Sequence, residues 1–195
     1  MFLNKTQFKK WIKEAYNHSG LTVGMVHDGL VLQGHAWIVW IDEGHIPNWV
    51  KAAVMEHTGI LPDSGDMFRA VKDEPIQYEI TKNIFFDLPG TFIDAKVPFT
   101  VTPIIYDAGW NTNRLFQVNE TKSLIPVNEA LYGIIDFKEL EGENPPVGPS
   151  ALTYDGSLLM WKNENSALAI CKAASLSDTG NKTMELLTKI NYGEA

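Results

Sequence analysis

The stretch LTVGMVHDGLVLQGHAWIVWI, residues 21–41, places the pair Asp28-Gly29 between two apolar runs and ends in a third run that begins at Ala36. An Asp-Gly pair flanked by apolar runs is a strong signal for a β-hairpin, because the turn requires residues that accept a positive φ angle. Both faces of the third run are apolar, so we expect that strand to be covered on both sides. The stretch therefore predicts three consecutive strands, over residues 22–27, 30–34 and 36–42.

A second stretch repeats this order of features near the other end of the chain. The pair Asp155-Gly156 is preceded by Leu-Thr and followed by apolar residues up to Ile170, and the first pair has the same Leu-Thr before it and apolar residues after it. An amphipathic helical pattern precedes each stretch, over residues 5–17 and 127–140. Helices interleaved with hairpins favour an α+β fold over a doubly wound parallel sheet. We therefore expect antiparallel sheets with amphipathic helices on one face, in an internally duplicated architecture.

Each copy of this unit would form one subdomain. We expect a helix-hairpin subdomain over residues 1–90 and a second over residues 91–195, or one continuous domain that contains both units. Apolar periodicity, with glycine or proline at the segment boundaries, predicts two further helices, over residues 48–58 and near residues 181–190. The middle of the chain favours strands, which we expect over residues 67–71, 76–80, 84–87 and 97–106.

The helix expected over residues 5–17 carries two different faces. Its apolar residues recur with the spacing of one buried stripe: Phe8, Trp11, Ile12, Ala15 and Tyr16. Lysines occupy the remaining arc, with no acidic residue among them: Lys5, Lys9, Lys10 and Lys13. The whole chain of 195 residues has 16 Lys and Arg against 24 Asp and Glu, which gives a formal net charge of −8. This asymmetry indicates either a solvated helix face or the place where a nucleic-acid backbone binds.

The helix followed by an Asp-Gly hairpin and a further apolar strand resembles the repeating unit of DNA sliding clamps. In that family, basic helices line a central hole, sheets form the outer rim, and the overall charge is acidic. The resemblance implies a noncatalytic DNA-associated protein without a cofactor, in which the DNA-binding residues are Lys5, Lys9, Lys10 and Lys13. The segment 127–140 departs from the family, because its charges are mainly acidic. The chain is also shorter than a typical clamp subunit, so a ring would require self-association of several copies.

A second hypothesis is a metal-dependent or acid–base enzyme centred on the N-terminal histidines. All five histidines lie within the first 57 residues, and strand alternation would bring His27 and His35 close together. His57, with Glu56 or Asp28, would complete such a site. However, Glu56-His57 lacks the second histidine of a His-Glu-x-x-His helix, and no phosphate-binding loop or dinucleotide fingerprint occurs. We therefore assign no catalytic and no metal-ligating residue, and we do not expect an enzyme.

A third hypothesis is a structural protein that binds a partner through an exposed aromatic residue. Trp110 lies in a polar turn over residues 108–113, and tryptophan is enriched at binding hot spots. The single cysteine, Cys171, excludes an internal disulfide framework, and its place at the end of an apolar strand favours an inert buried thiol. The sequence shows neither a signal peptide nor an apolar run long enough to span a membrane. We therefore expect a cytoplasmic protein that does not bind membranes.

Overall fold

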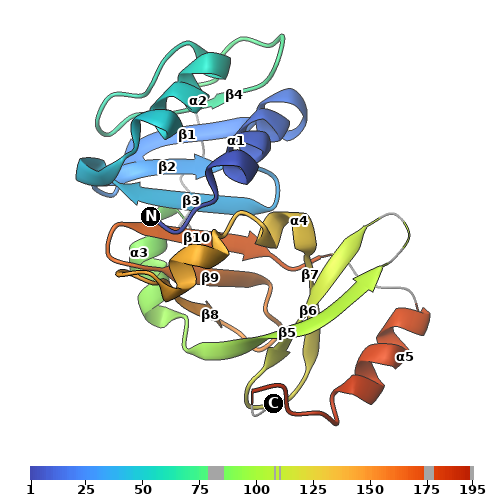
Figure 1. The fold of residues 1–195 in the computed structure, drawn as a ribbon. Coiled ribbons are helices and arrows are strands. Elements are labelled where there is room, and N and C mark those ends of the chain that lie inside the picture. Colours follow the sequence, from blue (N-terminus) through green and yellow to red (C-terminus); the bar gives the residue numbers. More distant parts are fainter. Residues whose placement is uncertain (79–85, 108, 110, 174–177, 194–195) are drawn as a thin grey trace.

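The computed structural model describes residues 1–78, 86–107, 109, 111–173 and 178–193. Within this part of the chain, ten strands form an antiparallel sheet in the order β4-β1-β2-β3-β10-β9-β8-β5-β6-β7 (Figure 1). The strands are β1 Leu21–Val26, β2 Gly29–Gln33, β3 Trp37–Asp42, β4 Met67–Ala70, β5 Val97–Asp107, β6 Thr112–Val118, β7 Leu124–Asn128, β8 Val147–Ala151, β9 Leu158–Lys162 and β10 Ser166–Cys171. The α-helices are α1 Lys5–Glu14, α2 Asn48–Thr58, α3 Leu88–Asp94, α4 Glu129–Tyr132 and α5 Asp178–Leu187. The expected α+β class with an antiparallel sheet is confirmed.

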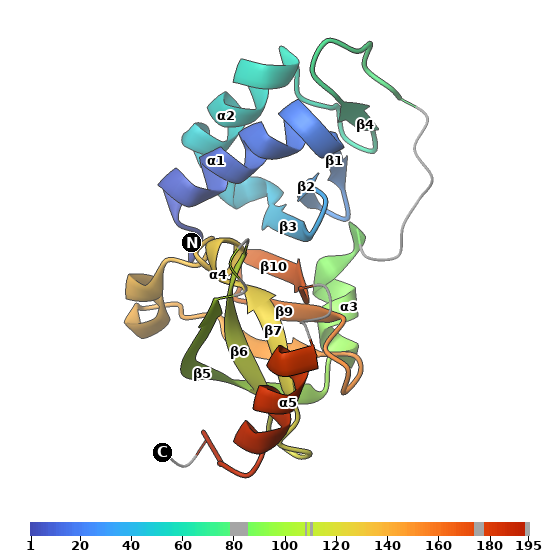
Figure 2. The ribbon, with the colours of Figure 1, turned by 90° about the vertical axis from the view of Figure 1, so that its right-hand side faces the viewer.

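Helices cover both faces of the sheet around β3. Helices α1 and α2 lie on one face of β1, β2 and β3, and α3 lies on the opposite face (Figures 1 and 2). Because side chains alternate along a strand, Trp37 and Val39 join the core under α1 and α2, whereas Ile38 and Trp40 join the core under α3. The expectation that this strand is covered on both sides is therefore confirmed.

The first hairpin turn lies one residue earlier than the sequence pattern suggests. His27 and Asp28 occupy the two turn positions, with φ angles of 54° and 55°, and Gly29 is the first residue of β2. Gly29 lies against the indole of Trp40, whose Nε1 donates a hydrogen bond to the His27 carbonyl at 3.0 Å. A Cβ atom on residue 29 would lie 2.5 Å from both Trp40 Nε1 and the carbonyl oxygen of Ile41. The glycine is therefore needed for close packing rather than for the turn.

The two hairpin stretches lie side by side in the same sheet. Strand β3 pairs with β10, the last strand of the second stretch, and β9 and β8 continue the sheet beyond it. Residues 152–157 connect β8 to β9, so the second hairpin has a longer connection than the first, although Gly156 does have a positive φ of 57°. The expected subdomain boundary after residue 90 falls inside α3. The internal duplication and the division into two subdomains stay predictions.

The prediction of a long helix over residues 127–140 is wrong. That segment contains the end of β7, the four-residue α4 and a 3-10 turn. The backbone after α4 pairs with the start of the chain instead: the Asn4 amide donates to the Ile134 carbonyl at 2.7 Å, and the Asp136 amide donates to the Phe2 carbonyl at 2.8 Å. These bonds use backbone groups that a longer helix would need for its own hydrogen bonds. A helix of several turns therefore precedes the first hairpin but not the second.

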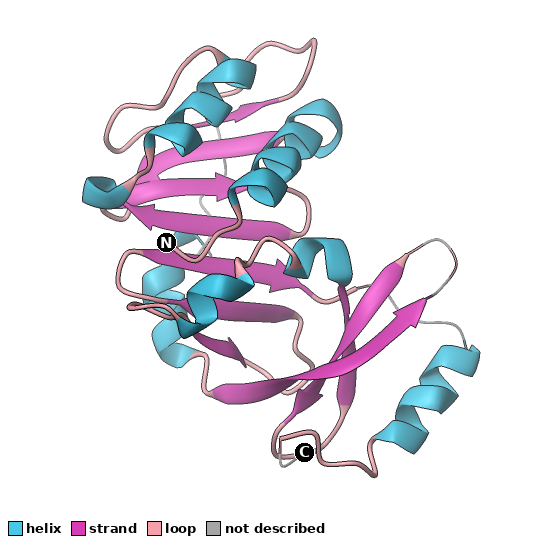
Figure 3. Ribbon diagram, in the orientation of Figure 1, coloured by secondary structure: helices cyan, strands magenta, loops and turns pink. Residues whose placement is uncertain are grey.

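Two of the other expected helices and two of the other expected strands agree with the structure (Figure 3). Helices α2 and α5 and strands β4 and β5 occur close to the positions that the sequence predicts. The strands expected over residues 76–80 and 84–87 are absent from the residues of these segments that the structure describes, 76–78 and 86–87, where Gln77 forms only an isolated bridge with Arg69. The remaining residues of both segments lie outside the described part of the chain. Among the helices of the described residues, none is both long enough and apolar enough to cross a membrane.

Candidate nucleic-acid interface

Helix α1 begins and ends at residues suited to those positions. The Asn4 side chain caps its start by accepting hydrogen bonds from the amides of Thr6 and Gln7, each at 3.1 Å. Such a cap satisfies amide groups that have no partner within the helix. A short π-helical segment, Ala15–Ser19, follows α1 and ends at Gly20, which has a φ of 88°. The helix is therefore fixed at both ends and gives its side chains defined directions.

Four lysines of α1 form a basic surface that we call the α1 lysine face: Lys5, Lys9, Lys10 and Lys13. Lys5, Lys10 and Lys13 are exposed, and Lys9 is half-buried. The four-residue spacing of Lys5, Lys9 and Lys13 brings them to one side of the helix, over a length of about 12 Å. Within the described residues, no carboxylate forms an ion pair with any of the four. The structure therefore brings the predicted lysines together as unpaired charges.

Packing against two neighbouring helices and the core beneath fixes the orientation of the α1 lysine face. Phe8 and Ile12 are fully buried beneath the helix. Helix α2 lies alongside α1 and runs parallel to it. Phe8 of α1 contacts Trp49 at the start of α2, with ring centroids 6.2 Å apart. Tyr16, just after α1, stacks on His57 near the end of α2, with ring centroids 5.3 Å apart. On the other side, the Trp11 indole donates to the Ala130 carbonyl of α4 at 3.1 Å. The lysines therefore occupy the side of α1 that faces solvent.

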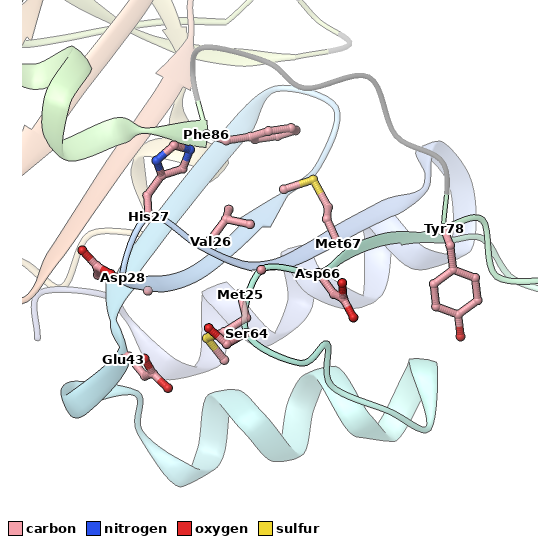
Figure 4. Close-up of a pocket in the computed structure, with 12 residues that line it drawn as sticks. Met25, Val26, His27, Asp28, Glu43, Ser64, Asp66, Met67, Tyr78 and Phe86 are labelled. Atoms are coloured by element: carbon pink, nitrogen blue, oxygen red, sulfur yellow. The ribbon is translucent and has the colours of Figure 1, made fainter.

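A cavity of about 600 Å³ lies at the β1–β2 turn and has the opposite electrostatic character (Figure 4). Three carboxylates border it, from Asp28, Glu43 and Asp66, and its described lining includes no lysine or arginine. In Figure 4, Met67 and Phe86 lie together on the side of β1 that faces α3. Carboxylates repel phosphate groups, so this cavity does not extend the α1 lysine face.

The structure does not bring the candidate histidines together. His27 lies in the β1–β2 turn and His35 lies in the β2–β3 loop, at opposite ends of β2, whereas the sequence favoured a close approach. His57 lies on α2 and stacks on Tyr16. Within the described residues, no group of three or more His, Cys, Asp or Glu side chains could hold a metal ion. The arrangement therefore gives no support to a site centred on these histidines.

The thiol of Cys171 is half-buried at the end of β10. Burial raises the pKa of this thiol above its ordinary value, so the thiol stays protonated at neutral pH. A protonated thiol is a poor nucleophile. The environment of Cys171 therefore fits the inert thiol that the sequence predicts.

The role of Trp110, the predicted partner-binding residue, stays a prediction, because this residue lies outside the described residues.

The contact between Trp11 and Ala130 joins residues 119 positions apart, and no local sequence signal indicates it. Apolar spacing alone places Trp11 in the buried stripe, but its indole lies at the border between α1 and α4.

Comparison with known proteins gives little further information. No protein-family model matches the chain, and no curated protein matches it by sequence. Among solved structures, one match is the beta chain of DNA polymerase III from Streptococcus pneumoniae, with 9% sequence identity and a TM-score of 0.30. The match covers 91% of this chain and 66% of that chain, so the chain spans just under two thirds of that protein. A TM-score this low carries no argument about function.

Proposed function

We propose that this chain is a noncatalytic DNA-binding module of sliding-clamp-like architecture that holds the phosphate backbone through α1. The observation that carries the proposal is the α1 lysine face: four unpaired lysines on the solvent side of one helix, in a chain whose net charge is −8. Exposed lysines surrounded by solvent often have no function. Here the chain as a whole is acidic, and the four lysines lie together on one helix with no acidic residue between Lys5 and Lys13.

The spacing of the lysines suits a phosphate backbone. Each strand of duplex DNA carries one phosphate for about every 3.4 Å of helix axis, so a lysine stripe about 12 Å long spans three or four phosphates of one strand. Lysine ammonium groups are flexible point charges without the fork geometry that reads base edges. Contacts of this kind position a protein on DNA and carry no sequence information. The proposed binding is therefore independent of sequence.

The acidic remainder of the chain would restrict how DNA approaches. Charges of one sign repel a polyanion over a distance set by the ionic strength, whereas a basic surface attracts it. Exposed acidic residues lie around the loop that precedes and follows β4: Asp63, Asp66, Asp73 and Glu74. DNA would consequently meet α1 in preference to the loops near β4. Self-association would bring the α1 lysine faces of several copies onto the same DNA. We therefore include self-association in the proposal.

The salt dependence of duplex affinity tests this proposal. Each phosphate that a lysine neutralises releases condensed counterions, which contributes about −0.9 to the slope of log K against log salt concentration. With four lysines, we expect a slope of about −3 to −4 and a loss of about a hundredfold in affinity between about 50 and 200 mM salt. Fluorescence anisotropy of a labelled blunt duplex measures both quantities.

The same titration reports on the number of chains that bind. A slope clearly steeper than about −4 would require more than one copy of α1 on the DNA, as self-association predicts. Two duplexes of equal length and different sequence serve as the control, because their affinities should agree. Absence of duplex binding at low salt, or a slope near zero, would contradict the proposed function.

A further inference from the structure

The α1 lysine face borders α2 on one side (Figure 2). With about 100° of rotation per residue, Trp11, which contacts α4, lies about 60° from Phe8 in one direction around the axis of α1. Tyr16 lies in the other direction and stacks on His57 of α2. Three lysines also lie in that second direction, about 60°, 100° and 140° from Phe8: Lys5, Lys9 and Lys13. This row of lysines is therefore on the side of α1 that borders α2.

Trp49 faces the row of lysines from α2. It lies in the first turn of α2, and its ring meets that of Phe8 edge to face, with an interplanar angle of 90°. Phe8 is adjacent to Lys9 in the sequence and one helical turn from Lys5. Lys9 is half-buried whereas the other three lysines are exposed, as expected for the lysine that points most directly at α2. The indole of Trp49 therefore lies at the border of the α1 lysine face.

The indole N–H of Trp49 is available to a ligand. The side chain is half-buried and packs against the core, so the ring is held in place. Within the described residues, no acceptor pairs with Trp49 Nε1, whereas the indoles of Trp11 and Trp40 each donate to a backbone carbonyl. In that same part of the chain, Ser150 Oγ is the one side-chain atom that is both enclosed and unpaired, so Trp49 Nε1 reaches solvent. An indole donates a hydrogen bond and accepts none, which suits an anionic oxygen.

Resting on the proposed function, we propose that Trp49 is a further DNA contact, which donates a hydrogen bond from Nε1 to a phosphate oxygen held by Lys5 and Lys9. Lysine ammonium groups are flexible point charges, whereas the packed Trp49 ring gives its N–H a fixed direction. A hydrogen bond to a charged group is stronger than one between neutral groups. The contact would set the position of the backbone along α1 without reading a base. Because the indole is neutral, it would add affinity without adding to the salt dependence.

Trp49→Phe tests this proposal, because phenylalanine keeps an aromatic ring against Phe8 and lacks the N–H. Anisotropy titrations with the blunt duplex should show about a tenfold loss of affinity at each salt concentration, with an unchanged slope of log K against log salt. Lys9→Gln, by contrast, should make that slope less negative by about 0.9. Trp40→Phe is the matched control and should retain wild-type affinity, because its indole N–H bonds to His27 on the side of the sheet that faces α3. Urea denaturation of each variant reports whether it is folded.

The wild-type protein gives a second readout that requires no substitution. In an NMR titration with the blunt duplex, the indole N–H signal of Trp49 should shift, because this group gains an acceptor. The signal of Trp40, which already has an acceptor, should not shift.

The outcomes separate this inference from the proposed function. If Trp49→Phe binds duplex as tightly as the wild type, or the Trp49 signal does not move at saturating duplex, the Trp49 contact is overturned and binding by the lysines stands. A loss of affinity with a flatter salt slope would mean that Trp49 only positions the lysines, and an equal loss in Trp40→Phe would mean a general change of fold; either result overturns the contact. If the wild-type protein does not bind duplex, the proposed function fails and the Trp49 contact fails with it.

Discussion

Reversing the charge of three α1 lysines, in the variant Lys9→Glu, Lys10→Glu, Lys13→Glu, is expected to abolish duplex binding at low salt. The change removes three of the four phosphate contacts and adds three negative charges at the same surface. We expect the affinity to fall by at least about a hundredfold, to below detection in an anisotropy titration. The helix should persist, because its buried side chains Phe8 and Ile12 and the Asn4 cap are untouched.

A matched control variant has the same net charge, but its three Lys→Glu substitutions lie outside α1. Lys96, Lys182 and Lys189 are exposed lysines outside α1, without an ion pair to any described residue. The variant Lys96→Glu, Lys182→Glu, Lys189→Glu should retain most of the duplex affinity. Equal losses in the two triple variants would show that total charge, and not the α1 lysine face, governs binding.

Replacing Gly29 by alanine should cause the largest loss of stability among single glycine-to-alanine changes in the first hairpin. The added Cβ atom would lie 2.5 Å from the Ile41 carbonyl oxygen, a backbone atom that cannot rotate away, and equally close to Trp40 Nε1. Strand β2 or β3 must shift, which would disturb the hydrogen bond from Trp40 to His27. We expect the free energy of unfolding to fall by about 2–3 kcal/mol, measured by urea denaturation.

Gly24→Ala is the matched control for that stability measurement. Gly24 lies in the neighbouring strand β1, and its added Cβ atom would meet the far end of the Met67 side chain at 2.5 Å. A flexible methionine can adopt another rotamer, so the cost should stay below about 1 kcal/mol. If Gly29→Ala costs no more than Gly24→Ala, the close packing of Gly29 against β3 is not needed for stability.

Local chemistry explains why α1 and the first strands could be predicted from sequence. The Asn4 cap and the buried stripe through Phe8 and Ile12 are features within a few residues of one another. The hairpin turn lies one residue earlier than predicted because the packing of Trp40 on Gly29 sets the register of the strands. This contact joins two different strands, so the local sequence pattern does not indicate it. The prediction of a long helix over residues 127–140 was wrong because the backbone of this segment pairs with residues 2–4, which lie far away in the sequence.

The candidate interface likewise combines features that local sequence spacing predicts with contacts that only tertiary packing creates. The α1 lysine face follows from the spacing of charges on one helix, so the sequence alone identifies it. The contact of the Trp11 indole with the Ala130 carbonyl of α4, by contrast, joins elements that are separate in the sequence. Apolar spacing describes Trp11 only as a core residue. The position of its indole at the border of α4 depends on tertiary packing, which periodicity does not indicate.

Lysine modification in the presence of DNA tests the central claim most directly, because it requires no substitution. Reductive methylation followed by mass spectrometry would compare each lysine in the free protein and in the complex with a saturating blunt duplex. The proposal predicts that Lys5, Lys10 and Lys13, which are exposed in the free protein, become protected, while Lys182 and Lys189 react equally in both samples. Unchanged modification of the α1 lysines in a fully formed complex would contradict it.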